Sequence, residues 1–164
     1  MPGNDLVLHE EEFTKIREVI SRLRGECNAK VVFLVDKNGQ QIAAIGELNS
    51  IDTTALASLA AGNVAATDSL ARLIGEKEFS VLFHEGERDN LHISVVAGRV
   101  ILVVIFDERS SLGLVRLRVK KGSHELAAIL DVMLKKSAAP RKAAAGGTPF
   151  SEITDEDIDK LFSD

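Results

Sequence analysis

The four histidines are the residues of this chain best suited to metal binding or acid–base chemistry, since imidazole titrates near neutral pH and ligates transition metals. His84 and His92 fall on two predicted strands around a turn at residues 86–90, and a simple hairpin would set them opposite each other. Two imidazoles can begin a zinc site, but no cysteine or well-placed carboxylate completes it, so an ordinary cross-strand pair is favoured. His9 and His124 stand apart in charged surroundings and are expected to be solvated.

The lone cysteine, Cys27, has no adjacent histidine to activate it and is expected to be a small, partly buried residue. It excludes an internal disulfide, which suits a reducing compartment. Asp155, Asp157 and Asp159 are spaced like the first three ligands of a calcium loop, but Lys160 stands where that loop needs glycine. The sequence therefore predicts no metal site.

Motifs for nucleotide binding and covalent catalysis are missing. Neither G-x-x-x-x-G-K-[ST], G-x-G-x-x-G nor G-x-S-x-G occurs, so no catalytic residues and no cofactor are expected. Arg88, in a predicted turn, and Arg109, after the last predicted strand, could instead be inserted into a partner's phosphate site. Exposed turn arginines are usually only solvated, so neither is assigned that role.

Composition and charge limit the partners. The chain has 164 residues, 45% of them hydrophobic, enough for one compact domain. Its formal net charge is −5, and residues 151–164 alone carry six acids against one lysine, also −5, which leaves a neutral body of 19 basic and 19 acidic residues. Such a body is a poor match for nucleic acid. The longest apolar run, Val100–Phe106, is too short to span a membrane, so a cytoplasmic location is expected.

The hydrophobic periodicity predicts an α+β fold, an α/β/α sandwich with a mainly antiparallel five-stranded sheet. The apolar run at 100–106 predicts the central strand, and Asp52 is the predicted N-cap of the second helix. Within 110–136 the second half is clearly helical, whereas the first half alternates like a strand. The predicted helices are 10–26, 53–73 and 110–136, and the predicted strands are 30–36, 41–46, 80–85, 91–97 and 100–106.

Beyond this domain of residues 1–136 we expect a flexible linker at 137–149, rich in alanine and glycine, and an acidic amphipathic helix within 150–164. The helix would be too short to be stable in isolation. Docking on its own domain and docking on a partner are equally favoured. Its predicted contact residues are apolar: Phe150, Ile153, Ile158, Leu161 and Phe162.

The second predicted helix carries small residues at every fourth position, Ala57, Ala61, Ala65 and Ser69. Residues four apart share a helix face, and small side chains let another backbone come close. Larger apolar residues such as Leu59 occupy other parts of the helix. We therefore expect the small-residue face to contact another helix or protein rather than only its own sheet.

Several segments of the chain resemble the Roadblock/LC7 family. The match is carried by residues 28–39 (NAKVVFLVDKNG), 51–54 (IDTT), 61–66 (AGNVAA), 104–107 (VIFD), 111–118 (SLGLVRLR) and the tail from 149 to 162. The resemblance covers nearly the whole chain. It implies the order α-β-β-α-β-β-β-α and favours helix for residues 111–120.

By this resemblance the chain is a homodimer whose partner is an MglA-like small Ras-like GTPase, one per dimer, that sets cell polarity in gliding motility. It would activate GTP hydrolysis by repositioning the switch regions without an arginine finger. A non-catalytic adaptor or scaffold, and nucleotide exchange through the C-terminal helix, are the alternatives. No nucleic-acid or membrane partner is implied, and concentration at a cell pole is a further expectation. The implied GTPase-binding residues are Ala61, Ala65, Asp68, Ser69 and Arg72.

Overall fold

A computed structural model describes the backbone of residues 10–145 and the side chains of residues 10–136. The elements follow in the predicted order, α-β-β-α-β-β-β-α. Their bounds are α1 Glu10–Cys27, β1 Val31–Asp36, β2 Gln41–Gly46, α2 Thr53–Leu73, β3 Val81–Glu85, β4 Asn90–Val96, β5 Val100–Phe106 and α3 Leu112–Ala145. No helix in this part of the chain is both long and apolar enough to cross a bilayer.

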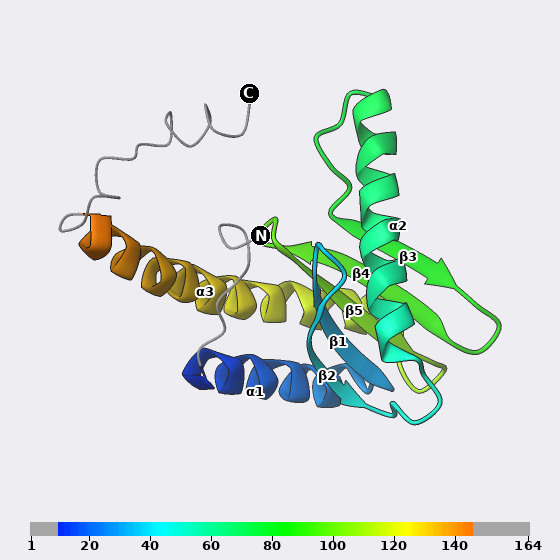
Figure 1. The fold of residues 1–164 in the computed structure, drawn as a ribbon. Coiled ribbons are helices and arrows are strands. Elements are labelled where there is room, and N and C mark those ends of the chain that lie inside the picture. The colour runs from blue at the N-terminus through cyan, green and yellow to red at the C-terminus, as the bar shows by residue number, and fades with distance from the viewer. Residues whose placement is uncertain (1–9, 146–164) are drawn as a thin grey trace.

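The strands form one antiparallel sheet in the order β2-β1-β5-β4-β3. β5 lies at its centre and is buried along its whole length, as its apolar sequence predicts. Helices α1 and α3 run side by side on one face of the sheet, and α2 covers the other (Figure 1). The predicted α/β/α sandwich is confirmed.

The two faces of the sheet build two separate hydrophobic layers, because successive side chains of a strand point to opposite sides. Under α1 and α3 the core includes Ile16, Ile20, Leu34, Leu102, Val104, Phe106, Leu126 and Leu130. Under α2 it includes Phe33, Ala57, Ala60, Val64, Ile93, Val103 and Ile105. The leucines and isoleucines of the helices thus lie mainly in the first layer.

The β3–β4 hairpin differs from its prediction by one residue of register. Phe83 lies opposite His92, and His84 lies opposite Leu91. The predicted pair of facing histidines is therefore wrong: His92 is buried on the α3 side of the sheet and His84 is exposed. The strands stay paired up to Glu85 and Asn90, which leaves residues 86–89 in the turn and sets this register.

Helix α3 begins at Leu112, so the first half of the ambiguous segment is helical, as the family resemblance implies. Val115 and Val119, one helical turn apart, are both buried, whereas Leu117 between them is exposed. The helix continues to Ala145 and includes residues 137–145, for which we predicted a linker. Alanine has the highest helix propensity, which favours this extension despite Pro140.

The rest of the predicted linker and the whole predicted C-terminal helix lie outside the described residues. The division into domain, linker and tail therefore stays a prediction. The same holds for the tail contact residues Phe150, Ile153, Ile158, Leu161 and Phe162.

Candidate functional site: the exposed surface of α2

Both ends of α2 are fixed by local backbone chemistry. The Asp52 carboxylate caps the start by accepting a hydrogen bond from the Ala55 N–H at 3.0 Å, as predicted. At the other end, Gly75 adopts φ +85°, which lets the following N–H groups turn back onto the last carbonyls. Glu76 N–H donates to the Ala71 carbonyl at 2.8 Å. The helix therefore has a defined length and direction over the sheet.

The helix packs on the sheet mainly through its smallest side chains. Its buried residues are Ala57, Ala60, Val64 and Ala71. The predicted small-residue face is divided between two environments, since Ala57 is buried against the sheet, Ala61 is half-buried, and Ala65 and Ser69 are exposed. The part of this face beyond Ala61 is thus accessible to a partner.

Large apolar residues of α2 lie on its solvent side, an arrangement that sequence reasoning missed. Leu59 is 72% exposed, Leu70 58%, Leu73 82% and the adjoining Ile74 69%. At 100° per residue, Leu73 lies opposite the buried alanines, and Leu59 and Leu70 lie on the flank of the helix, more than about 100° from the centre of the buried face. A prediction that turned the leucines toward the sheet and the alanines toward solvent would therefore assign the wrong face of α2 to the core.

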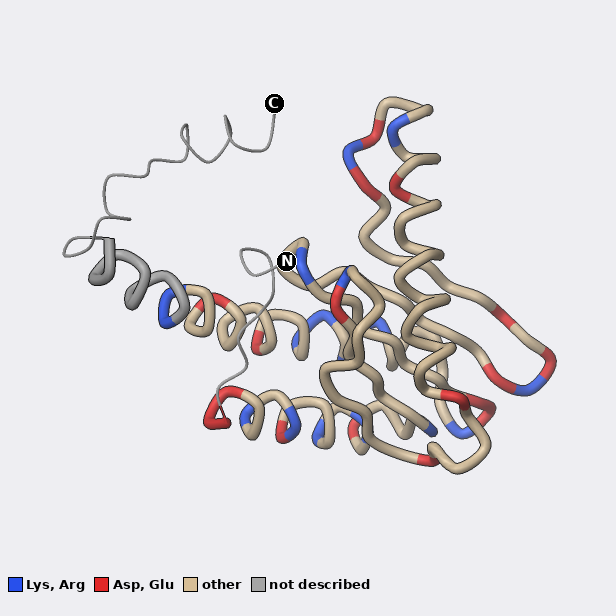
Figure 2. The backbone as a smooth tube through the Cα atoms, in the orientation of Figure 1, with Lys and Arg blue, Asp and Glu red and all other residues tan. Residues whose placement is uncertain are grey.

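The exposed surface of α2 carries almost no charge. Asp68 and Arg72 are the charged residues within Thr53–Leu73, and the tube of α2 is tan over nearly its whole length in Figure 2. Exposed apolar residues gathered on one element, rather than scattered singly, mark an interaction surface. We call the exposed residues Leu59, Ala65, Ser69, Leu70, Arg72, Leu73 and Ile74 the α2 surface.

Three of the predicted GTPase-binding residues are linked along the helix. Arg72 Nη2 donates to Ser69 Oγ at 3.3 Å, and Ser69 Oγ donates to the Ala65 carbonyl at 3.3 Å. Arg72 therefore lies back along α2 instead of pointing outward. Asp68 is half-buried, and its Oδ1 has no hydrogen-bond partner among the described residues. Ala61, one helical turn before Ala65, is half-buried, whereas Ala65 is exposed.

The β3 edge of the sheet is a second accessible feature. β3 pairs with β4 on one side, and within residues 10–145 no strand pairs with its other side. Val81 on this edge is 46% exposed. A row of free backbone N–H and C=O groups can pair with a second copy of the same strand.

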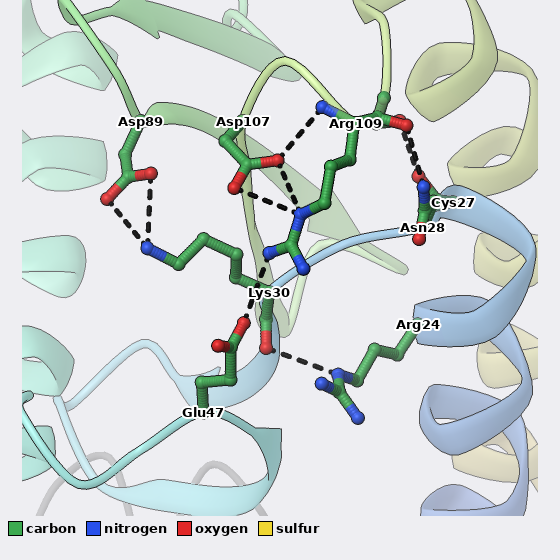
Figure 3. A network of polar contacts seen from close by, with 9 residues as sticks. Arg24, Cys27, Asn28, Lys30, Glu47, Asp89, Asp107 and Arg109 are labelled. Atoms are coloured by element: carbon green, nitrogen blue, oxygen red, sulfur yellow. Dashed lines mark hydrogen bonds and ion pairs between the residues drawn. The ribbon is translucent and has the colours of Figure 1, made fainter.

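Arg109, one of the two arginines considered for insertion into a partner, is held by two carboxylates (Figure 3). Its Nε donates to Asp107 at 3.0 and 3.2 Å, and its Nη2 donates to Glu47 at 3.3 Å. The hydrogen bonds that the Arg109 side chain and backbone N–H donate to Asp107 lower the pKa of its carboxyl below the usual value. Asn28 adds a 2.7 Å bond to the Arg109 carbonyl. Arg109 is thus a structural link between the residue that follows β2 and the segment that follows β5.

Arg88, the other candidate, lies exposed in the β3–β4 turn. No group of three or more histidine, cysteine, aspartate or glutamate side chains in the described residues could hold a metal. The α2 surface, with its exposed leucines, offers shape and apolar contact to a partner.

The comparisons with known proteins agree with this fold. The family model described as the Roadblock/LC7 domain matches residues 15–106, more than half of the chain. The chain belongs to the Roadblock/LC7 family, a family of regulatory rather than enzymatic domains.

Within that family the chain is similar to MglB. It is 62% identical to Myxococcus xanthus MglB, with a TM-score of 0.74, covering 78% of this chain and 96% of that one. It is 35% identical to the gliding protein MglB of Thermus thermophilus, with a TM-score of 0.72, covering 77% and 96%. A third MglB structure, described as having a tetrameric arrangement, is 33% identical with a TM-score of 0.75, covering 79% and 97%. The comparison with curated proteins gives no match.

Proposed function

We propose that this protein is a GTPase-activating regulator of an MglA-like small Ras-like GTPase, acting as a homodimer in bacterial cell polarity and motility. The observation that carries the proposal is the α2 surface, which presents exposed leucines and almost no charge. The partner class is what the family resemblance implies, and the 62% identity to Myxococcus xanthus MglB supports that proposal. Fold alone would not assign a function, so the surface is the element to test.

The proposed dimer joins two β3 edges, so that the sheets become continuous and the two α2 helices lie near a common twofold axis. The MglB structure described as tetrameric supports self-association of such chains. Each α2 then contributes Ala65, Ser69 and the exposed leucines to one platform. A single GTPase lies across the platform, and its switch regions are held in the geometry that hydrolyses GTP.

Activation without an inserted arginine suits the placement of the two candidate arginines. Two carboxylates already hold Arg109, and Arg88 lies in the β3–β4 turn rather than on α2. The catalytic groups would therefore be those of the GTPase. A non-catalytic adaptor would use the same surface without changing turnover, and exchange through the predicted helix at 150–164 would be separate from it.

Single-turnover GTP hydrolysis by the GTPase, with and without this protein, tests the proposal. We expect an acceleration of at least about tenfold, since correct positioning of reacting groups is worth far more than that. The double variant Ala65→Arg with Ser69→Arg should lose binding and activation while light scattering still shows a dimer. The control Ala128→Arg, at an exposed alanine of α3 on the other face, should keep both.

Three results would contradict this function. A stable complex with an unchanged hydrolysis rate would leave the adaptor. Retained binding by the double variant would show that the α2 surface is not the docking site. A protein that is monomeric at assay concentration would exclude the shared platform.

A further inference from the structure

A cavity of about 450 Å³ lies between β4, the beginning of β3 and α3, on the face of the sheet opposite α2. β4 contributes His92 and Ser94, which are two residues apart and point to the same side. Ser80 lines the cavity just before β3, and one face of α3 contributes further polar groups at spacings of three and four residues: Arg116, Lys120, Ser123 and His124. The volume is in the range of small-molecule sites.

The β4 side of this cavity contains buried polar atoms without partners. His92 is 1% exposed, yet neither its Nδ1 nor its Nε2 has a hydrogen-bond partner among the described residues. Ser94 Oγ is buried and unpartnered in the same way. Across the neighbouring strands, His92 lies opposite Phe83 and Val104, neither of which has a polar side-chain atom. Buried polar side chains normally have a partner, so two such groups at adjacent inward positions require an explanation.

The α3 side of the cavity is positively charged. Arg116 and Lys120 are exposed, one turn apart, and neither forms an ion pair with any residue whose side chain is described. The cavity has no aspartate or glutamate in its lining. The net effect is a pocket with hydroxyl and imidazole groups at its base and two cations at its mouth.

We propose that this cavity binds a small organic phosphate monoester. The phosphate oxygens accept hydrogen bonds from His92, Ser94 and Ser123. Positive charge comes from Arg116 and Lys120. Hydrogen bonds to an ionised group are stronger than those between neutral groups. The volume exceeds the needs of a phosphate group, and Val81 and Val119 in the lining provide apolar contact for the organic remainder. The site lies on the opposite face from the α2 surface and does not depend on the proposed GTPase function.

An anion in this cavity would also change the titration of His92. In the free protein, burial and then the nearby Arg116 lower the pKa of the imidazole below its ordinary value. The charged or titratable groups facing it come from α3 and are Arg116, Lys120 and His124, whereas the adjacent strands present Phe83 and Val104. A bound dianion would offset the charges of Arg116 and Lys120 and raise the pKa of His92. A residue with only a packing role would show no such rise.

The test uses the full-length protein in a chloride buffer, with glycerol 3-phosphate and inorganic phosphate as probes and glycerol as the uncharged comparison. We expect saturable changes in the NMR signals of His92, Ser94 and Ser123, tighter binding of the monoester than of phosphate, and none of glycerol. Arg116→Gln should weaken binding by at least about tenfold, which is the loss of one charge-assisted contact. The control Lys121→Gln removes the same charge from the next turn of α3 but from outside the cavity lining, and should leave affinity unchanged.

Three results would overturn the proposal. They are signals that do not change on adding either probe, an equal loss in Lys121→Gln and Arg116→Gln, and an unchanged pKa of His92 when the probe is bound. The second would indicate attraction of anions to the basic face of α3 without a built site. Because Arg116 is exposed, its substitution should not affect folding.

Discussion

The buried imidazole of His92 should make the stability of this protein depend on pH in a defined direction. The pKa of His92 is lowered in the folded state, first by burial and then by Arg116, from an ordinary value of 6.5. At pH values between the folded-state pKa and the unfolded-state pKa of about 6.5, the unfolded chain therefore binds up to one more proton than the folded chain does. The free energy of unfolding then falls as pH falls, and this contribution is fully present only above the unfolded-state pKa.

The magnitude follows from the proton linkage of a single group. A histidine that takes up its proton only in the unfolded state reduces the free energy of unfolding by about 0.4 kcal/mol at pH 6.5 and about 1.4 kcal/mol at pH 5.5. The contribution of His92 over this interval is therefore at most about 1 kcal/mol. That amounts to a loss of up to about fivefold in the ratio of folded to unfolded protein.

Urea denaturation in Bis-Tris chloride, which avoids oxyanions that would enter the cavity, measures this dependence. The variant His92→Gln removes the titrating group and should flatten the stability curve between about pH 6.5 and pH 5.5. The control His84→Gln removes an exposed histidine from the neighbouring strand and should leave the curve as in the parent protein. If His92→Gln and the parent protein lose stability in parallel, the buried imidazole is not the cause.

Three further outcomes can be measured directly. Gly46→Ala places a Cβ against the Lys30 carbonyl oxygen at φ +125° and should lower the free energy of unfolding in urea by at least about 2 kcal/mol. At Gly25, in α1, an added Cβ would meet no atom outside its own stretch of helix, so Gly25→Ala should raise the free energy of unfolding by up to about 1 kcal/mol. Equal effects of the two substitutions would refute the steric argument. Arg88→Ala should leave GTPase activation within about threefold, and a loss of several hundredfold would establish it as an inserted arginine. Burial raises the pKa of the Cys27 thiol to about 11, so its thiolate fraction at pH 8 is about a hundredfold below that of an ordinary cysteine. Ellman's reagent should therefore label Cys27 only after unfolding, and rapid labelling of the native protein would contradict this.

Local sequence signals predicted most of the fold because each rests on short-range physics. The Asp52 cap, the apolar run of β5 and the periodicity of α1 all follow from residues within one element. The resemblance settled the one local conflict, at the start of α3. There the alternation of Val115 and Val119 with arginines is compatible with both a strand and a helix, and burial against the sheet selects the helix.

The hydrophobic pattern of the sequence did not predict the features that depend on tertiary packing. The register of the β3–β4 hairpin depends on how many residues the turn takes, and an offset of one residue places Phe83 instead of His84 opposite the buried His92. The sequence did not predict which face of α2 contacts the sheet, because both alanine and leucine can pack closely on a sheet. The cavity joins β4 to α3, two elements that no local motif connects.

The way α2 is held also determines where the molecule opens. Burying an alanine methyl removes far less apolar area from water than burying a leucine does, so α2 is anchored less firmly than α1 or α3. Residues 65–73 contain a single buried side chain, Ala71, and their amide hydrogens should exchange with deuterium earliest among the helices. A partner that covered Leu70 and Leu73 would bury apolar area that the single chain leaves exposed, and its binding would be measured as slower hydrogen exchange in this part of α2.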